Sequence, residues 1–483
     1  MSDAASLPPS DHESSLGRRS RWRVLLWLSA IFLLLFSIVP ISWAVIRWRT
    51  NQAIAAELDR IRAAGEPASF EDVIDSIPPL APEKDCTQLY DEVFAIITSQ
   101  VWERRAGSLP YVGDGEADES SIPPPGVDWL GLEAAAKFID GENYNFMTLD
   151  KAAALGGECR FALTGSDLTT QDVMRVGYKP RAAARLLSLR AIVAAHRYHP
   201  SDLHLTLTAL GVLPNCLAAE PQALSLEVRV ALYGMYYYQS AQMLDFAGFS
   251  DEQLAALQDV TRDVDYCEQL RQAVRWERLY CAQCFDGAYA LDSELTALMS
   301  KRPRIWYCVS HVDAWEYWRA MRRYCDATRS NDLVAVWRDT NQVNDDIQQT
   351  LARSSAMPQR YFVTNGTVGG AWHLAAAAVR GTATDRAFNT FVACYRYKLK
   401  HSAFPERLDD LVPACLAAVP QDPFANAPIR MTKIDGDLVI YSVGPDGKDD
   451  GGEARSDDLR YRSNSWKRTY EESRAKVQGT AQP

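Results

Sequence analysis

The sequence predicts a mainly α-helical protein with one N-terminal transmembrane helix, an ectodomain of helical hairpins and a small C-terminal α+β module. Three observations lead to this fold class. A long uncharged apolar run lies near the N-terminus, and apolar residues recur at helical spacing through the middle of the chain. Prolines, turns and short strand-like runs replace that pattern near the C-terminus. With 483 residues, 47% of them hydrophobic, the chain can build a large core and more than one domain.

The apolar run covers residues 24–46, VLLWLSAIFLLLFSIVPISWAVI, and contains no charged side chain. A helix rising about 1.5 Å per residue would cross a hydrocarbon layer of roughly 30 Å over this length. Trp27, Trp43 and Trp48 lie toward its ends, as tryptophans at a membrane interface do. A cleaved signal peptide is the alternative, but the run is longer than a typical signal core and no clear cleavage site follows it.

The charges beside the span predict its orientation. The flanking arginines are Arg18, Arg19, Arg21 and Arg23 before the span, and Arg47 and Arg49 after it. Because the more positive flank stays in the cytoplasm, we expect residues 1–23 to form a cytoplasmic tail at a bacterial inner membrane, with the main domain outside the cytoplasm. The first fifty residues carry six arginines against three acids, so the rest of this chain of net charge −11 carries −14. Such an acidic surface repels nucleic acid, and no nucleic-acid partner is expected.

The ectodomain is predicted to be helical. Residues 47–129 are expected to form a tether, the first helices and an exposed loop rich in acids and proline, and residues 130–380 to continue as helical hairpins. Ser250 and Gln253 have the spacing of a capping box at the start of a helix. Residues 203–210, LHLTLTAL, alternate as a strand would, but their helical neighbours favour a helix.

The character of the chain changes in residues 384–463, where an α+β module is expected. Its helix is predicted to start with Thr384 as N-cap and to stop at Pro405. PIRMTK and DLVIYSV then read as two strands, and the Asp435-Gly436 pair between them suits a hairpin turn. Residues 464–483 are polar and are expected to form a flexible tail.

An unusual concentration of charge lies in residues 441–458, YSVGPDGKDDGGEARSDD, which hold six carboxylates and four glycines. Carboxylates at close range repel each other by about 1 kcal/mol per pair even in water. A divalent cation removes that cost, and calcium takes six to eight oxygen ligands of the kind that a flexible Asp/Gly loop supplies. A solvated acidic turn is the alternative interpretation, because the spacing of an EF-hand is not met.

The residues around this loop resemble the C-terminal part of the major pseudopilin of type II secretion systems. The matching motifs are Phe404-Pro405, the turn from Leu408 to Leu411, Asp422-Pro423-Phe424 and the loop Ser442-Val443-Gly444-Pro445-Asp446-Gly447. In that family the loop binds one structural calcium ion. The resemblance implies that the ligands here are the Asp446 carboxylate, the carbonyls of Val443 and Lys448, and Asp457 or Asp458.

The chain also departs from the pseudopilin pattern. Pseudopilins are short and carry a processing site in front of their membrane helix, whereas this N-terminus carries arginines and the apolar span lies far from the matching segment. The resemblance therefore implies a calcium-stabilised module and not a pilus subunit. The whole layout is similar to that of membrane-anchored proteins of planctomycete-type bacteria, a likeness that implies no particular activity.

Other chemistry-bearing residues favour structural roles. The ten cysteines leave any disulfide pairing open. Cys281 and Cys284 form a C-x-x-C motif, a redox pair in some proteins, but they sit inside a predicted helix and are interpreted as packed or bridged residues. A zinc site could be formed by His196, His199 and His204, but histidines at a helix end are better explained by the helix dipole. An aromatic groove could be formed by His311, Trp315, Tyr317 and Trp318, but core packing explains these residues better.

Motifs for catalysis are missing: the sequence contains no G-x-S-x-G, no H-E-x-x-H and no Walker loop. The function predicted from sequence is therefore a non-enzymatic, membrane-anchored envelope protein that acts in secretion, assembly or protein binding. Its partners would be the membrane and an envelope protein, and its calcium would be structural. The alternative is an extracytoplasmic enzyme that uses a pocket in the helical domain.

Overall fold

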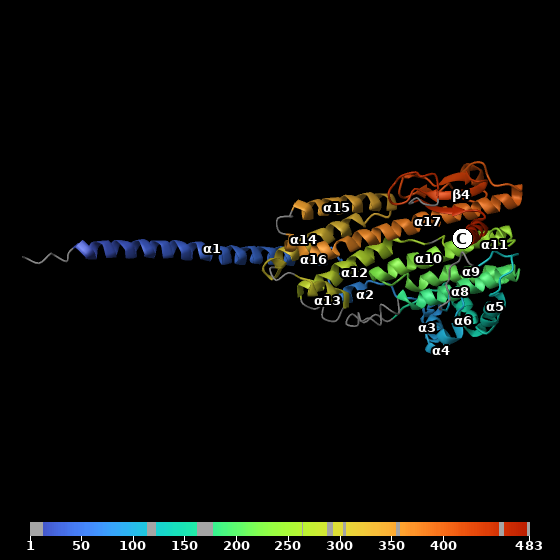
Figure 1. The fold of residues 1–483 in the computed structure, drawn as a ribbon, viewed down its shortest axis with the longest axis horizontal. Helices are drawn as coiled ribbons and strands as arrows, with labels where there is room; N and C mark the ends of the chain where they lie inside the picture. Colours follow the sequence, from blue (N-terminus) through green and yellow to red (C-terminus); the bar gives the residue numbers. More distant parts are fainter. Residues whose placement is uncertain are drawn as a thin grey trace, which may run out of the picture.

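The computed structural model describes residues 13–113, 122–161, 177–262, 264–286, 293–302, 306–353, 358–453 and 458–480. Long helices run along one axis of the molecule, and a small antiparallel sheet lies at the end far from the N-terminal helix (Figure 1). The prediction of a mainly helical chain with a C-terminal α+β region is thus confirmed.

The N-terminal helix α1 (Glu13–Ala63) is continuous through the predicted span and projects alone before it joins the body (Figure 1). Its apolar side chains are widely exposed, Trp27 by 71% and Phe36 by 70%, whereas Ile61 within the body is 5% exposed. Among the residues that the structure describes, no helix is both long enough and apolar enough to cross a membrane. Parts of the predicted span, at 24–26, 30, 32–35 and 39, lie outside the described side chains.

The last part of α1 is bound to the body through buried charges. It packs against α14 (Trp306–Ala327), where Arg322 donates a 3.0 Å hydrogen bond to Glu57. Arg278 of α12 (Cys267–Asp286) is almost fully buried and donates to the Glu66 carboxylate at 3.2 Å and to the Pro67 carbonyl at 2.8 Å. Breaking such a pair would leave a charge uncompensated away from water, so separating the end of α1 from the body carries a high cost in free energy.

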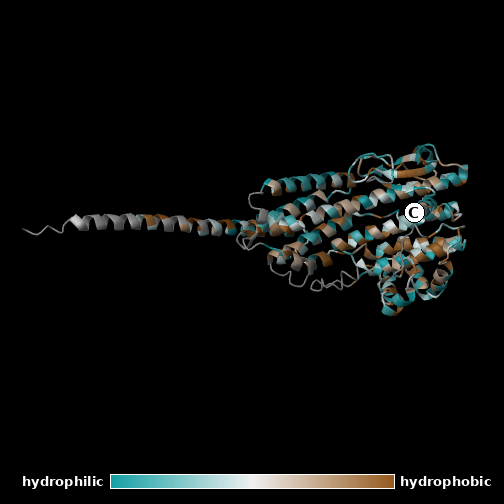
Figure 2. Ribbon diagram, in the orientation of Figure 1, coloured by the Kyte–Doolittle hydropathy of each residue, from teal (hydrophilic) through white to brown (hydrophobic). Residues whose placement is uncertain are grey.

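The body is built from two groups of helices. The first group in chain order is α2 (Phe70–Asp75), η1 (Pro82–Lys84), α3 (Thr87–Ile97), α4 (Gln100–Ala106), α5 (Leu132–Asp140), α6 (Asn143–Ala154), α8 (Lys179–His196), α9 (Pro200–Val212), η3 (Leu213–Leu217), α10 (Ala223–Met243) and α11 (Asp251–Asp259). After α12 follow α13 (Ser293–Ser300), α14, α15 (Leu333–Arg353), η5 (Pro358–Tyr361), α16 (Phe362–Thr367) and α17 (Gly369–His401). Brown and teal residues alternate along these helices, as expected for amphipathic helices that share a core (Figure 2).

Two local predictions for the helices are confirmed. At α11 the Ser250 hydroxyl accepts from the Gln253 amide while the Gln253 side chain accepts from the Ser250 amide, so the capping box is complete. Residues 203–210 lie within α9, where Leu203, Leu207 and Leu210 are all buried. The i, i+4, i+7 spacing of these leucines overrides the strand-like alternation because it gives the helix one continuous apolar face.

The prediction that a helix starts at Thr384 is wrong. α17 begins at Gly369, and the Thr384 hydroxyl donates to the Arg380 carbonyl at 2.8 Å, as a mid-helix threonine does. The alanine-rich stretch before Thr384 has a high helix propensity and continues the helix. The boundary expected at residues 380–384 therefore lies inside one helix. α17 ends at His401, close to Pro405, with Ser402 in the left-handed conformation at φ +57°.

The sheet follows α17 and η6 (Leu408–Leu411). Its three antiparallel strands are ordered β3 (Arg430–Ile434), β4 (Asp437–Ser442) and β5 (Leu459–Arg462), and a separate two-stranded ladder pairs β1 (Gln421–Asp422) with β2 (Ala427–Pro428). The predicted hairpin turn is confirmed: Asp435 and Gly436 join β3 to β4 with φ values of +52° and +86°. β4 is buried along its whole length because it packs against α17.

The prediction of a flexible tail at 464–483 is wrong for residues 465–480, which form α18 (Ser465–Thr480). Trp466 is 3% exposed, and its indole donates to the Ile122 carbonyl at 2.9 Å. Arg468 pairs with Asp437 of β4. A polar composition hides this docking because one tryptophan and one arginine are enough to hold the helix start.

The buried joint of α1 gives a stability prediction. We expect Arg278→Leu to lower the free energy of unfolding by about 3 kcal/mol, since it leaves the Pro67 carbonyl unpaired and the buried side of Glu66 without its cation. Arg319→Leu is the matched control, because Arg319 is half-exposed and pairs with Glu316 at 3.5 Å on the surface, and it should cost less than about 1 kcal/mol. Urea unfolding followed by circular dichroism measures both. Equal losses in the two variants would contradict the role given to the joint.

Candidate functional site

The acidic loop connects β4 to β5 at the end of the body far from the projecting part of α1 (Figure 1). Its first turn is closed by a hydrogen bond from the Gly447 amide to the Gly444 carbonyl at 3.2 Å. Both glycines have positive φ, +69° and +68°, a conformation that favours glycine. The glycines of this loop thus allow the chain to reverse directly after a buried strand.

Asp422 fixes the point where the loop leaves β4. Its side chain is fully buried, and its two carboxylate oxygens accept from the Ser442 hydroxyl at 2.8 Å, from the Val443 amide at 2.9 Å and from the Phe424 amide at 3.0 Å. Arg430 approaches the same carboxylate at 3.5 Å. The Asp-Pro-aromatic motif was the only sequence signal of this residue, which the ligand prediction did not include.

Two exposed carboxylates of the loop are neutralised by protein donors. Asp446 accepts from the Lys448 amide at 3.0 Å and pairs with the Lys448 ammonium at 3.3 Å. Asp449 accepts from the Tyr441 hydroxyl and from the Gly451 amide, both at 3.0 Å, and pairs with Arg430 at 3.0 Å. The backbone hydrogen bonds, followed by these cations, lower the pKa of both carboxyls. Part of the loop's self-repulsion is therefore offset without a metal.

Asp458 closes the loop from its other end. It is 8% exposed, and its carboxylate accepts from the Gly452 amide at 2.8 Å. Burial raises the pKa of Asp458, and the nearby charges of Asp450 and Asp449 act in the same direction. At Gly452, φ is +74° and a Cβ atom would lie 3.0 Å from Tyr441 and Val439 side-chain atoms, so a larger residue would push the loop off β4.

The predicted calcium ligands are brought together only in part. Asp446 and Lys448 are adjacent partners, Val443 is buried with its amide on Asp422, and Asp458 is bound to Gly452. Asp457 lies outside the described residues. Within the described ranges, no group of three or more His, Cys, Asp or Glu side chains is arranged to hold a metal ion. The carboxylate and carbonyl oxygens present have the chemistry that calcium prefers, and a full shell needs further donors.

The cysteines agree with the packing interpretation. All nine described cysteines are buried free thiols, and the side chain of Cys308 lies outside the description. Cys281 and Cys284 lie within α12, where the Cys281 thiol donates to Glu277 at 3.1 Å. Burial raises the pKa of the Cys281 thiol well above its usual value, and a protonated buried thiol is a poor nucleophile.

The histidines serve separate contacts. His196 lies 3.0 Å from the Pro123 carbonyl and between the Trp129 and Trp466 rings, and His204 lies 3.1 Å from the Gln253 carbonyl. The predicted aromatic stretch also packs in the core: Tyr317 is fully buried and its hydroxyl donates to the Arg278 carbonyl at 2.9 Å. These side chains tie loops and helices to one another.

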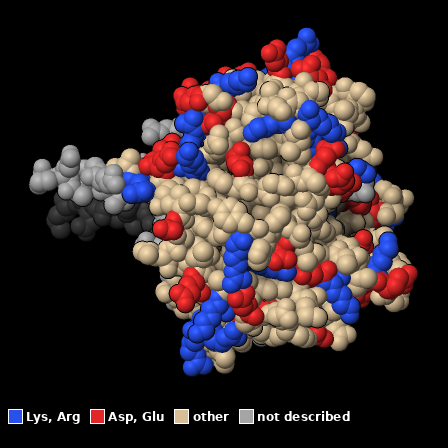
Figure 3. All heavy atoms as spheres, turned by 90° about the vertical axis from the view of Figure 1, so that its right-hand side faces the viewer, with Lys and Arg blue, Asp and Glu red and all other residues tan. Residues whose placement is uncertain are grey.

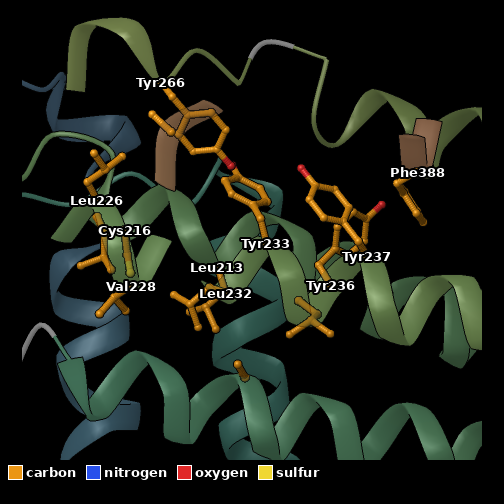
Figure 4. Packing of buried hydrophobic residues seen from close by; sticks show 14 of the residues in the cluster. Leu213, Cys216, Leu226, Val228, Leu232, Tyr233, Tyr236, Tyr237, Tyr266 and Phe388 are labelled. Atoms are coloured by element: carbon orange, nitrogen blue, oxygen red, sulfur yellow. The ribbon is translucent and has the colours of Figure 1, made fainter. Parts of the chain in front are cut away.

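A half-buried acid that the sequence did not reveal lies beside the tyrosines of α10. Figure 4 shows Tyr236 and Tyr237 next to Phe388, with the Tyr237 ring 5.0 Å from that of Phe388. The Tyr237 hydroxyl donates to Asp385 of α17 at 3.0 Å, and the Asn389 amide donates to the same oxygen at 2.9 Å. Burial raises the pKa of Asp385 to about 6. The sequence signal that could have indicated this site is the pair Asp385 and Asn389, two polar residues one helical turn apart among the apolar residues of α17.

A cleft of about 290 Å³ lies near the start of α18 and contains a second perturbed acid. Burial raises the pKa of Asp245, yet both of its oxygens are occupied: one accepts from the Tyr395 hydroxyl at 2.5 Å and the other from the Asn464 amide at 2.6 Å. Lys398 and the half-exposed Leu399 complete the rim. Asp245 therefore links α17 to the segment that leads into α18.

The comparisons with known proteins give no relative: no family model, no curated protein and no solved structure matches this chain. Function has to be argued from the residues alone.

Asp385 gives a pH-dependent prediction. Because its pKa is raised on folding, the folded state holds the proton more tightly, and the contribution of Asp385 to stability is lost as the pH rises from about 4 to about 6. We expect Asp385→Asn, which keeps an oxygen acceptor for Tyr237, to raise the melting temperature at pH 7 relative to the parent and to have little effect at pH 4. Asp409→Asn, at an exposed acid, is the control. Equal effects of Asp385→Asn at both pH values would refute the assignment.

Proposed function

We propose that this protein is anchored by residues 24–46 in a bacterial inner membrane and presents its helical body outside the cytoplasm. The projection of α1 carries the proposal, because its large apolar side chains are exposed on a helix that extends beyond the body (Figures 1 and 2). Such side chains are Trp27, Leu28, Ile31, Phe36, Ile38 and Ile41. In water this surface costs about 25 cal/mol per Å², a cost that a bilayer removes.

The body, in this proposal, binds an envelope protein in secretion or assembly and does not catalyse a reaction. Three acids support it, since the half-buried Asp385 and Asp245 and the buried Asp422 each use their oxygens to join separate elements. The cleft between α5, α6 and α8, of about 350 Å³, follows the same pattern: its Arg190 and Arg197 are paired with Asp150 and Asp140. These ion pairs favour a structural role for the arginines of this cleft over the enzyme alternative.

Calcium, in this proposal, stabilises the acidic loop. The ligands would be the carboxylate of Asp446, the carbonyls of Val443 and Lys448, and Asp457 or Asp458, with water completing the shell. Asp422 supports this arrangement because it fixes Ser442 and Val443, the residues from which the loop starts. An ion that binds only the folded loop would stabilise the module by mass action.

The anchor is tested by membrane extraction and by a reporter. We expect the full chain to stay in the membrane fraction at alkaline pH, and a phosphatase fused after Pro483 to be active outside the cytoplasm. Ile31→Arg/Phe36→Arg should release the protein, since each arginine near the centre of a span costs about 3 kcal/mol. Asn51→Arg/Gln52→Arg, on the exposed surface beyond the span, should leave it bound. The anchor would be refuted if the reporter proved to be cytoplasmic, or if alkaline pH extracted the parent protein from the membrane.

The calcium site is tested by thermal unfolding in calcium and in chelator. Calcium at about 100 times its Kd should stabilise the protein by about 2.7 kcal/mol and raise its melting temperature accordingly. Asp446→Ala should abolish the shift, whereas Asp450→Asn, an acid of the same loop outside the predicted ligand set, should keep most of it. The same shift in the parent and in Asp446→Ala, or no shift in the parent, would eliminate the predicted ligands.

A further inference from the structure

The end of the body from which α1 projects is assembled from five segments far apart in sequence. These segments, which we call the stalk-end face, are residues 43–56, 297–302, 306–312, 351–353 and 358–367. Figure 1 shows α13, α14, α16 and the end of α15 at this end of the molecule. Contacts join the segments to one another.

Three contacts place these segments together. The His311 ring of α14 lies 6.0 Å from the Trp43 ring of α1, edge to face. Met299 is buried against Val363 of α16. Gly366 packs so close to Leu298 that a Cβ atom would lie 3.1 Å from that side chain. α14 also contacts η5 and α16, so these four segments form one surface, with the end of α15 at the same end of the molecule in Figure 1.

The stalk-end face is basic although the chain as a whole has a charge of −11. Its cations are Arg47, Arg49, Lys301, Arg302, Arg353 and Arg360, all of them exposed except Arg302, which is half-buried. The five described segments contain no aspartate and no glutamate; the acid that follows them on α1, Glu57, is 6% exposed and paired with Arg322, and the side chain of Glu294 on α13 lies outside the description. The next acid along α14 is Asp313, which is fully buried and accepts from the Val363 and Thr364 amides at the start of α16.

Two of these cations contribute to the potential at the same ring. After burial, the charges of Arg47 and Arg360 lower the pKa of His311, although the two arginines are far apart in sequence. The opposite end of the body differs: in Figure 3 acidic and basic side chains are interspersed over that face. The concentration of one sign of charge therefore belongs to the stalk end.

We infer that the stalk-end face binds the anionic phospholipid headgroups of the membrane in which α1 is anchored. This inference rests on the proposed anchor, because the span ends at residue 46, Arg47 and Arg49 follow at once, and the body already contacts α1 at Trp43 through His311. No linker separates span from body, so the face lies at headgroup level. Lys and Arg are attracted there by the negative surface potential, which decays within about 8 Å at physiological salt.

The exposed tryptophans distinguish a lipid surface from an acidic protein partner. Trp43 and Trp48 are 38% and 62% exposed beside the basic residues. Indole rings favour the boundary between headgroups and acyl chains, and the Arg47 guanidinium lies over the Trp43 ring at 5.2 Å. A soluble acidic peptide would match the charges but not this ring of aromatic surface around the helix.

The test uses the full chain in nanodiscs of phosphatidylcholine alone and of phosphatidylcholine mixed with phosphatidylglycerol. Exposed Lys301 is modified with an amine-reactive reagent, and Lys137, exposed on α5 at the far end, is the internal control. We expect Lys301 to react several-fold more slowly in the anionic discs, with Lys137 unchanged. Raising the salt to about 1 M, where the screening length falls to about 3 Å, should remove the difference.

Two double variants locate the effect. Arg353→Glu/Arg360→Glu should abolish the lipid-dependent protection of Lys301, whereas Arg104→Glu/Lys151→Glu, with the same charge change at exposed sites on α4 and α6, should preserve it. Failure of the parent to enter discs would refute the anchor itself. Normal incorporation with equal Lys301 reactivity in both lipids, or protection that appears only when an acidic protein is added, would refute lipid binding by this face.

Discussion

The architecture depends on the contact between α10 and α17, where aromatic rings from three parts of the chain meet. The Tyr237 ring packs beside that of Phe388 at a tilt, and Tyr461 of β5 lies against both Phe388 and Phe391. α17 thus packs against the helical body on one side and against the sheet on the other. Because one continuous helix serves both, the acidic loop is held at a fixed place relative to the helical core.

α17 has a second close contact, at a position where a side chain larger than that of glycine would be crowded. At Gly381 a Cβ atom would lie 3.1 Å from the Tyr266 ring, so α17 can approach the start of α12 only through a glycine. α12 in turn supplies Arg278 to the joint with α1. A chain of direct contacts therefore connects the stalk, α12, α17 and the sheet, and this packing makes the body a single unit.

Sequence reasoning succeeded where local chemistry decides the structure. The capping box at Ser250 and the Asp435-Gly436 turn depend on neighbouring residues, and both were predicted. It failed where a distant contact decides. Trp466 docks on the Ile122 carbonyl and turns an apparently loose tail into a helix, and Thr384 lies within α17 because the preceding alanines continue the helix.

The same reasoning applies to the candidate sites. Crowded acids and glycines reveal the acidic loop, but Asp422 and Asp385 resemble surface acids until the burial of Asp422 and the hydrogen bond from Tyr237 to Asp385 are known. The basic stalk-end face is invisible in the sequence, since its cations are spread over segments with only one or two each and the chain as a whole is acidic.

The joint of α1 has a mechanical consequence. α1 and α14 run in the same direction side by side, since His311 and Arg322 meet Trp43 and Glu57 in the same order along both helices, and Arg329 meets Glu66 just beyond their ends. A pull along the axis of α1 would load these attachments together, in shear, and not one after another as in peeling. Shear geometry distributes force over every attachment at once, so no single contact carries the load alone.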